Sequence, residues 1–406
     1  MTSCRICEAP VEPFMSFGKM PIANGFLAPD DFDGEYFFDL LPTICRKCGM
    51  FQIAEQPAPE AMFHENYAFY SSTSVHMARH FRAAAEIMKE RYLAEDPFVV
   101  EIGSNDGIML RNFAEVGIRH LGVEPSANVA DVARQSGVAT VCAFFDQSLV
   151  DDIVEKNGRA DVVFAANVIC HIPAFSVVAD GVRRLIKPDG VFIFEDPYLG
   201  DMVAKTSYDQ IYDEHVFIFS ATSVQNALVP HGLELVDVQP QATHGGSMRY
   251  VVAHEGRRQA SAAVKELLAK ENTLGLADPV TFERFRQRCE RSKDELMELL
   301  HRCKKEGQRV IGYAATSKST TVTNFCGITP DLVECVVDTT PSKQGLFSPG
   351  AHLPIRPYEE FSARYPDYAL LFAWNHLSEI MEKEQHYTAT GGKWITYVPE
   401  VKIFGS

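Results

Sequence analysis

Short β-branched runs alternate with amphipathic stretches over residues 98–200, and this alternation restricts the fold more than any other feature of the sequence. Successive strand, helix and strand units form a parallel sheet with helices on both faces. The sequence therefore predicts an α/β fold with a doubly wound sheet at the centre of the chain. Strands are predicted at residues 98–102, 120–123, 139–142, 162–165 and 191–195, and helices near residues 107–116, 127–136 and 175–187.

The 406-residue chain is too long for one ordinary domain, because domains typically contain roughly 100–200 residues. A lead-in helix is predicted at residues 76–93, and a long polar helical stretch over residues 258–305. Further β-rich runs occupy residues 309–314, 332–337 and 368–372. We expect a small zinc-binding β module at residues 1–75, a doubly wound domain at residues 76–243, and a Rossmann-like α/β domain with its helical connector at residues 244–406.

Two C-x-x-C pairs lie in the N-terminal module, Cys4 with Cys7 and Cys45 with Cys48. This spacing allows each pair to place two thiolates about 2.3 Å from one tetrahedral Zn²⁺. Four cysteine ligands leave no position open for water, so we predict a structural zinc in a module whose core is too small to fold without metal. The alternatives are two unrelated cysteine pairs or a redox dithiol.

A glycine-containing turn, Gly103-Ser104-Asn105-Asp106-Gly107, follows the first predicted strand of the sheet. Ligands of such sheets bind at the carboxyl ends of the strands. The G-x-G-x-x-G pattern of dinucleotide sites fails here, because residue 105 is Asn and residue 108 is Ile. The turn instead resembles motif I of the class I S-adenosylmethionine-dependent methyltransferases. This resemblance implies that Gly103, Asn105 and Asp106 bind the cofactor.

Glu124 ends the next predicted strand, 21 residues after Gly103. A carboxylate in this position can accept hydrogen bonds from the ribose hydroxyls of a bound nucleoside. A nicotinamide site uses an acid in the same place, so the failed glycine pattern is what favours S-adenosylmethionine. We expect Phe145 to wall the adenine, and Asn167, after the fourth strand, to lie near the reacting centre.

Tyr212, Glu214 and His215 lie within four residues of one another after the fifth predicted strand. They supply a hydrogen-bond donor, a carboxylate and an imidazole, which is the set needed to remove a proton next to a carbonyl group. A polar helix face is the alternative interpretation of this cluster.

A Cys4 zinc module, a methyltransferase core and a Y-x-E-H sequence together resemble the nucleotide-sugar C-methyltransferase family. The similarity extends to the C-terminal segments His244–Arg249, Gly312–Lys318, Val337–Asp338, Lys343–Gly345, Ala373–Asn375 and Val398–Val401. Members of this family act on nucleotide-linked 4-keto-6-deoxysugars, and their C-terminal domain closes over the nucleotide sugar. The resemblance implies C-methylation, with C-3 favoured and dTDP or GDP as the carrier, in branched deoxysugar biosynthesis.

The resemblance also implies roles for individual residues. His215 is the expected general base at the carbon alpha to the C-4 ketone, because an imidazole of ordinary pKa is largely neutral at cellular pH. Tyr212 would donate to the C-4 oxygen of the enolate, and Glu214 would orient the sugar or the imidazole. Tyr70 or Tyr67 would bring an aromatic ring into the site from the N-terminal module. The expected substrate residues are His171, Arg249, Ser317 and Lys318, the last two at the diphosphate.

Other interpretations remain for some of these residues. His171 could instead be a capping or core histidine, and Ser317 with Lys318 a solvated surface turn. The alternative function is an S-adenosylmethionine-dependent O- or N-methyltransferase for another small molecule, in which loss of His215 should be mild.

The formal charge of −16, from 54 acidic and 38 basic residues, argues against a nucleic-acid partner but is compatible with a local basic pocket. It also disfavours a non-catalytic zinc-knuckle binding module. No apolar run reaches the ~18 residues of a membrane span, and the N-terminus lacks the layout of a signal peptide. We therefore expect a cytoplasmic protein without a membrane partner, and separately we expect a monomer.

Overall fold

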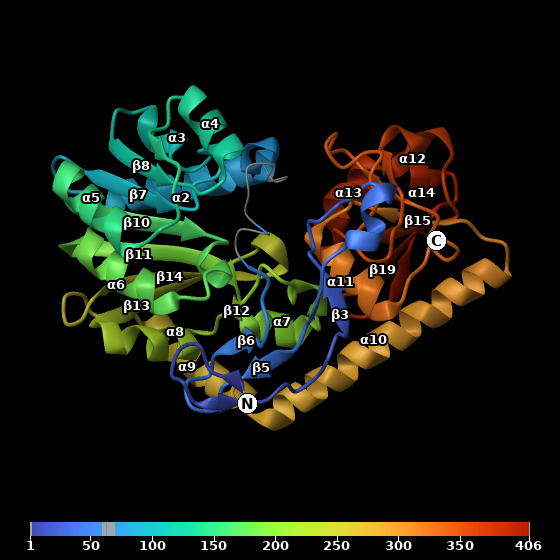
Figure 1. Cartoon of the computed structure of the whole chain (residues 1–406), viewed down its shortest axis with the longest axis horizontal. Coiled ribbons are helices and arrows are strands. Elements are labelled where there is room, and N and C mark those ends of the chain that lie inside the picture. Colours follow the sequence, from blue (N-terminus) through green and yellow to red (C-terminus); the bar gives the residue numbers. More distant parts are fainter. Residues whose placement is uncertain (1, 59–61, 63–69, 406) are drawn as a thin grey trace.

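The computed structural model describes residues 2–58, 62 and 70–405 of the chain. Figure 1 shows a sheet domain in cyan and green and a second sheet domain in orange and red, connected by the long helix α10 (Pro279–Lys305). The blue N-terminal module lies between the two domains. No helix in the described ranges combines the length and the apolar composition that a membrane crossing needs.

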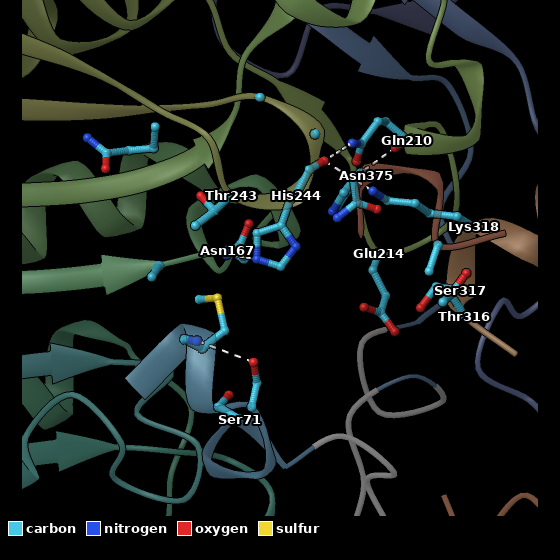
Figure 2. A pocket seen from close by; sticks show the side chains of 18 of the residues that line it. Ser71, Asn167, Gln210, Glu214, Thr243, His244, Thr316, Ser317, Lys318 and Asn375 are labelled. Carbon is cyan, nitrogen blue, oxygen red and sulfur yellow. Dashed lines mark hydrogen bonds between the residues drawn. The ribbon is translucent and has the colours of Figure 1, made fainter. Parts of the chain in front are cut away.

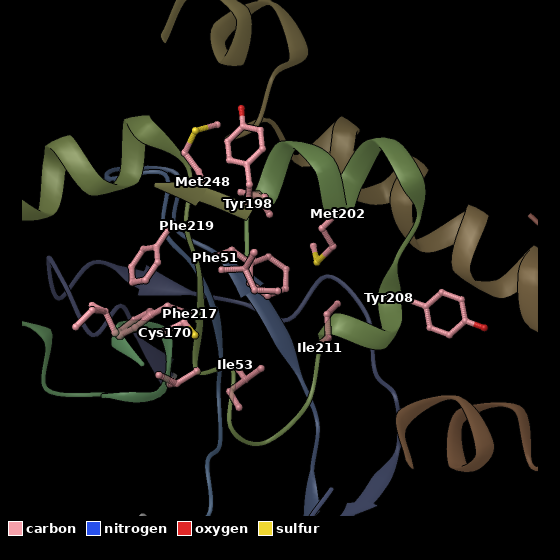
Figure 3. Packing of buried hydrophobic residues seen from close by; sticks show 14 of the residues in the cluster. Phe51, Ile53, Cys170, Tyr198, Met202, Tyr208, Ile211, Phe217, Phe219 and Met248 are labelled. Carbon is pink, nitrogen blue, oxygen red and sulfur yellow. The ribbon is translucent and has the colours of Figure 1, made fainter. Parts of the chain in front are cut away.

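The described part of the N-terminal module consists of short strands. They are β1 (Thr2–Ser3), β2 (Pro10–Val11), β3 (Lys19–Pro21), β4 (Phe37–Asp39), β5 (Pro42–Ile44) and β6 (Phe51–Ile53). Strand β6 also pairs antiparallel with β12 (Phe217–Ile218) of the central domain, so the two parts share the sheet β12-β6-β5. Phe51, Tyr198, Phe217 and Phe219 are buried at this junction (Figure 3), where the module and the central domain form one core.

The central sheet has the strand order β9-β8-β7-β10-β11-β14-β13. Strands β7 to β11 run parallel, and β14 runs antiparallel to both of its neighbours. This arrangement confirms the predicted doubly wound sheet. Its strands are β7 (Phe98–Ile102), β8 (Arg119–Val123), β9 (Thr140–Val141), β10 (Ala160–Ala166), β11 (Ile186–Pro197), β13 (Leu233–Gln241) and β14 (Ser247–His254).

Strands β13 and β14 are missing from the set predicted from the sequence. The edge strand β13 carries several polar residues and Pro240, a composition that also suits a loop. Strand β14 lies beyond residue 243, so the domain boundary expected between residues 243 and 244 falls inside this sheet.

Helices cover both faces of the central sheet, because alternate residues of each buried strand point in opposite directions. On one face Val99 packs with Phe81 of α2, and on the other Val100 belongs to the same cluster as Val178 of α6. The helices are α2 (Val75–Tyr92), α3 (Arg111–Ala114), α4 (Ala127–Gln135), α5 (Gln147–Asn157), α6 (Phe175–Leu185), α7 (Leu199–Lys205) and α8 (Ala221–Leu228).

The connector forms two helices, α9 (Ala262–Leu274) and α10, where one long helical stretch was expected. Gly275 ends α9 in the left-handed conformation with a φ of 65°. Asp278 then caps α10 through a 2.9 Å hydrogen bond from the Val280 amide, and Pro279 takes the first helical position.

The C-terminal domain contains a second sheet with the strand order β17-β16-β15-β18-β19-β20. Its described strand pairs are parallel except for β19 with β20, which is antiparallel. Its strands are β15 (Val310–Tyr313), β16 (Val336–Asp338), β17 (Ile355–Pro357), β18 (Tyr368–Leu371), β19 (Lys393–Thr396) and β20 (Lys402–Phe404). Its helices are α11 (Ser317–Cys326), α12 (Glu359–Ala363), α13 (Leu377–Lys383) and α14 (Gln385–Ala389). Helix α11 follows β15 directly and packs on α10.

Candidate active site

A cavity of about 1160 Å³ lies where the three parts of the chain meet. Its wall includes the carboxyl ends of β7, β8 and β10, the segment after α7, the start of α11 and the segment after β18 (Figure 2). Ligand pockets commonly measure about 300–1,000 Å³. This cavity therefore has room for a cofactor and a second molecule together.

The turn after β7 packs against Val168. Gly103 has a φ of 67°, and a Cβ atom there would lie 2.3 Å from Cγ2 of Val168. Asn105 and Asn167 also adopt left-handed conformations, with φ values of 48° and 53°. Asparagine tolerates this region better than most residues. Close packing thus requires a glycine at residue 103, where the backbone lines the cavity at the end of β7.

Glu124 lines the cavity at the end of β8 and is 6% exposed. Its two carboxylate oxygens accept hydrogen bonds from the amides of Asn105 and Ser126, at 2.9 and 2.8 Å. Burial raises the pKa of Glu124 despite these hydrogen bonds. Phe145 also lines the cavity and packs against Gly181. A carboxylate and a ring placed this way suit the ribose and the base of a nucleoside.

Asp106 does not line the cavity, although we expected it to bind the cofactor. It is fully buried, and its Oδ2 accepts a hydrogen bond of 2.9 Å from the Ser72 amide. Asn105 accepts a similar bond of 3.0 Å from the Ser71 amide. The two side chains therefore join the turn after β7 to the segment that leads into α2.

The predicted catalytic cluster is assembled around His215. The Nδ1 atom of His215 lies 2.7 Å from the carbonyl oxygen of Gln210, and the Nε2 atom lies 3.0 Å from the hydroxyl of Tyr212. A carbonyl can only accept, so Nδ1 carries the proton and Nε2 presents its lone pair to the tyrosine hydroxyl. The ring therefore has one defined tautomer, with Nε2 as its basic nitrogen.

Burial favours the neutral form of the two neighbouring histidines, His171 and His215. Burial lowers the pKa of His215 well below its usual value, and the nearby His171 lowers it further. Burial also lowers the pKa of His171 to about 3. The two rings stack with centroids 5.4 Å apart. A neutral imidazole is the form that can accept a proton.

Glu214 is buried beside this pair. Its Oε1 accepts a 2.7 Å hydrogen bond from the Asn24 amide, and Asn24 in turn accepts a 3.0 Å bond from the Ser317 hydroxyl. Burial raises the pKa of Glu214 to about 7. Three parts of the chain thus contribute to one line of hydrogen bonds.

The cavity is lined by two half-buried lysines of the C-terminal domain, Lys318 and Lys343, and by the exposed Lys402. Lys318 donates a 3.1 Å hydrogen bond to the His244 carbonyl and lies over the ring of Trp374. Lys343 donates a 2.8 Å bond to the Ala315 carbonyl and lies over the ring of Phe26. Burial lowers the pKa of both ammonium groups. Together with the N-terminus of α11, they create a positive wall in an acidic protein.

Two further expected site residues lie outside the cavity lining. The hydroxyl of Tyr70 accepts a 3.0 Å hydrogen bond from Asn128 at the start of α4. Arg249 forms a buried ion pair of 2.6 Å with Glu195, which also contacts His80 at 2.6 Å. Tyr67, the other candidate aromatic, lies outside the described residues.

The cavity also contains residues that we did not single out from the sequence. They include Asn24, Gln210, His244, Lys343 and Trp374. Only the family-like segments around His244, Lys343 and Trp374 offered a signal for them. For Asn24 and Gln210 the sequence carried none, because their partners are distant in the chain or are backbone atoms.

The four predicted zinc ligands converge. The Sγ atoms of Cys4 and Cys48 lie 3.5 Å apart, as do those of Cys7 and Cys45, and all four lie within 4.8 Å of one another. A tetrahedral ion bound at about 2.3 Å separates its sulfurs by about 3.8 Å. The hydrogen bond from Cys48 lowers the pKa of Cys4 to about 5. The cluster therefore fits Zn²⁺.

Cys170, His171 and His215 also bring ligand atoms within 4.8 Å of one another. The two imidazoles are stacked, and both nitrogens of His215 contact Gln210 or Tyr212. Stacked rings do not aim their lone pairs at one ion, so we do not interpret this group as a metal site.

Seven strands in this order, with a reversed strand next to the edge and a glycine turn after the first strand, define a class I S-adenosylmethionine-dependent methyltransferase. Comparison with family profiles agrees with this assignment. A C-methyltransferase C-terminal domain matches residues 242–399, a methyltransferase domain matches residues 77–238, and a zinc-binding domain matches residues 4–63.

The C-methyltransferase NovU of Streptomyces niveus is 34% identical over 407 residues, covering 99% of this chain and 97% of NovU. The ubiquinone biosynthesis O-methyltransferase of Colwellia psychrerythraea is 23% identical over 35% of this chain and 63% of its own length. The solved CcbJ methyltransferase from Streptomyces caelestis shares 18% identity, with a TM-score of 0.34, over 43% of this chain and 90% of its own.

The full-length match to NovU shows the family. The chain belongs to the C-methyltransferases that combine a zinc-binding module, a methyltransferase core and a dedicated C-terminal domain. Its cofactors are S-adenosylmethionine and zinc.

Proposed function

We propose that this protein methylates C-3 of a nucleotide-linked 4-keto-6-deoxysugar through an enolate. The observation that carries the proposal is the His215 imidazole, which is neutral, fixed in one tautomer by Gln210 and paired through Nε2 with the Tyr212 hydroxyl. A methyltransferase for oxygen or nitrogen acceptors has less need of such a base. Carbon acceptors need one, because a C–H bond beside a ketone is only weakly acidic.

Bound S-adenosylmethionine supplies an electrophilic methyl group on a positively charged sulfur. The cofactor would be held by Gly103, Asn105, Glu124, Phe145 and Asn167, the predicted cofactor residues that line the cavity. Asp106 would act indirectly, by fixing the turn through Ser72.

His215 would remove the proton from the carbon next to the ketone, and Nε2 would receive it. The Tyr212 hydroxyl donates to this nitrogen in the structure. It would turn away when substrate binds and donate instead to the developing enolate oxygen, while the protonated Nε2 donates to the tyrosine oxygen. A positioned donor of this kind stabilises an oxyanion in the transition state by several kcal/mol, roughly 2.7–4. Glu214 would bind a sugar hydroxyl, and His171 would form the wall beside the reacting carbon.

The diphosphate would bind at the start of α11. Ser317 and Lys318 occupy its first positions, and Lys343 approaches from the loop after β16. A helix N-terminus and two ammonium groups favour a doubly charged ligand. Arg249 would have no direct role, because its charge is paired with the buried Glu195.

The test is to incubate the purified protein with S-adenosylmethionine and either dTDP- or GDP-linked 4-keto-6-deoxysugar. We expect a mass increase of one methyl group on one of the two sugars, and a new methyl signal coupled to C-3 in the NMR spectrum. A methyl group on oxygen or nitrogen, or no transfer to either sugar, would overturn the proposal.

A further inference from the structure

The N-terminal module reaches the cavity through the turn that follows β3. Among the described residues of the first 58, Asn24 alone lines the cavity. The turn is tight, with hydrogen bonds from Gly25 N to Ile22 O and from Phe26 N to Asn24 O, at 3.0 and 2.9 Å. The described part of the zinc-binding module before residue 59 therefore contributes one polar side chain to the cavity.

The backbone on the N-terminal side of Asn24 is fixed by the other two parts of the chain. The Ala23 amide donates a 3.0 Å hydrogen bond to Asp213, and the Ala23 carbonyl accepts a 2.8 Å bond from the Thr320 hydroxyl on α11. Residue 23 is 1% exposed. Asn24 is thus presented from a rigid position.

The Asn24 amide contacts two groups of the proposed site at once. Its Nδ2 donates to Glu214 Oε1 at 2.7 Å, and its Oδ1 accepts from the Ser317 hydroxyl at 3.0 Å. Because a carboxylate only accepts, the contact with Glu214 places Nδ2 on that side, and Oδ1 is left to accept from the Ser317 hydroxyl, which can donate or accept. Figure 2 shows Glu214 directed toward Thr316 and Ser317.

We infer that Asn24 is a positioning residue for the methyl transfer, which orients the Glu214 carboxylate and couples it to the anion-binding end of α11. This inference rests on the proposed function, because it assigns Glu214 a place beside the sugar. It makes the N-terminal module part of the catalytic unit in addition to its structural role.

The ionisation of Glu214 depends on the groups that surround it. Asp213, Cys170 and the neutral His215 are its close titratable neighbours on the methyltransferase side, and Lys343 is the cation that faces it from the C-terminal domain. Burial favours the protonated acid, while Asn24 and Lys343 favour the carboxylate. Removal of the Asn24 donor should therefore keep Glu214 protonated to higher pH.

The test compares Asn24→Ala and the isosteric Asn24→Asp with the wild type, measuring kcat/KM for the nucleotide sugar from pH 5 to 10. At low pH, kcat/KM should fall as Glu214 becomes protonated, and we call this part of the profile the acid limb. We expect its midpoint to move to higher pH by about one unit in Asn24→Ala, and further in Asn24→Asp, which adds a second carboxylate. Activity should recover at high pH in the alanine variant, and Glu214→Gln should abolish this limb.

The matched control is Asn226→Ala, which removes a 3.1 Å hydrogen bond from α8 to the Cys48 carbonyl. This asparagine also links the N-terminal module to the core but lies outside the cavity lining. It should leave the acid limb in place. An equal loss of activity at every pH in the Asn24 variants, or an unmoved limb, would overturn the inference.

An infrared titration separates this inference from the proposed function. If the wild type fails to methylate either sugar, the proposed function fails. The ionisation of Glu214 can then still be followed by the carboxyl band that disappears in Glu214→Gln. A higher midpoint for that band in Asn24→Ala supports the inference, and an unchanged midpoint rejects it.

Discussion

Trp374 of the C-terminal domain lies directly against Gly245 of the central domain. A Cβ atom on Gly245 would lie 2.4 Å from Cη2 of the indole, and the φ of Gly245 is 87°. The indole nitrogen also donates a 2.6 Å hydrogen bond to the buried Asp209. One glycine thus permits the two domains to meet beside the cavity.

We expect Gly245→Ala to separate the two domains at this point and to lower kcat/KM for the nucleotide sugar by about 10²-fold, the scale of a small misplacement of reacting groups. Affinity for S-adenosylmethionine, measured by calorimetry, should be retained. Gly256→Ala is the control, because that residue has a φ of 71° but no atom within 4 Å of its added Cβ. Equal effects of the two substitutions would contradict the role of the Trp374 contact.

His215→Asn should lower turnover by about 10²–10⁴-fold while cofactor affinity is preserved, because only proton removal is lost. Solvent deuterium should enter the 4-keto sugar with the wild type and a non-transferring cofactor analogue, but not with the variant. His231→Asn is the control, because this half-buried histidine is paired with Asp180 and lies outside the cavity lining. Near-normal turnover of His215→Asn would place the base elsewhere, with His171 the next candidate.

Tyr212→Phe removes the donor next to His215 and should cost on the order of 10²–10³-fold in kcat, as for other oxyanion donors. The KM for the sugar should change less than kcat, because the enolate charge exists only after proton removal. Steady-state measurement of kcat and KM for the sugar tests this prediction. A change confined to KM would instead indicate a role in ground-state binding.

Glu124→Ala should weaken binding of S-adenosylmethionine by about 1.5–3 kcal/mol, the usual range for hydrogen bonds to a charged group. Part of this loss will come from the Asn105 and Ser126 amides, which lose their acceptor. Calorimetry with the cofactor measures it, and the exposed Glu115→Ala serves for comparison. Unchanged affinity would remove Glu124 from the ribose site.

Cys45→Ser should abolish stoichiometric zinc and lower the melting temperature, because the module has little core without its metal. One zinc per wild-type chain is expected by elemental analysis. Cys142→Ser is the control, since that thiol is exposed and lies far from the cluster in sequence. Wild-type protein without zinc, or a variant with full stability and metal content, would contradict a structural site.

Features with a local signal in the sequence could be predicted. The apolar runs from Phe98 to Glu195 defined the parallel strands, and the spacing from Tyr212 to His215 already placed both side chains together. The C-x-x-C pairs likewise defined the metal cluster. Patterns over a few residues suffice for such features, because strand period and ligand spacing are set by covalent geometry.

Polar side chains whose partners are determined by the fold could not be predicted from the sequence. Arg249 and Asp106 have the chemistry of binding residues, yet their partners are Glu195 and the Ser72 amide. Asn24 is the opposite case. It was not predicted as a site residue, because its contact with Glu214 spans 190 residues of sequence. No local pattern distinguishes these cases, since each side chain can satisfy its hydrogen bonds in either place.

The pairing of β6 with β12 has a consequence for how the chain is made. Gln52 lies opposite Phe217, so β6 leaves the ribosome 165 residues before its partner strand. At about 5–20 residues per second, the N-terminal module waits roughly 8–33 s for that strand. Zinc binding by its four cysteines can stabilise the module in the interval. The segment that carries His215, two residues before β12, can take its final position only after this delayed pairing.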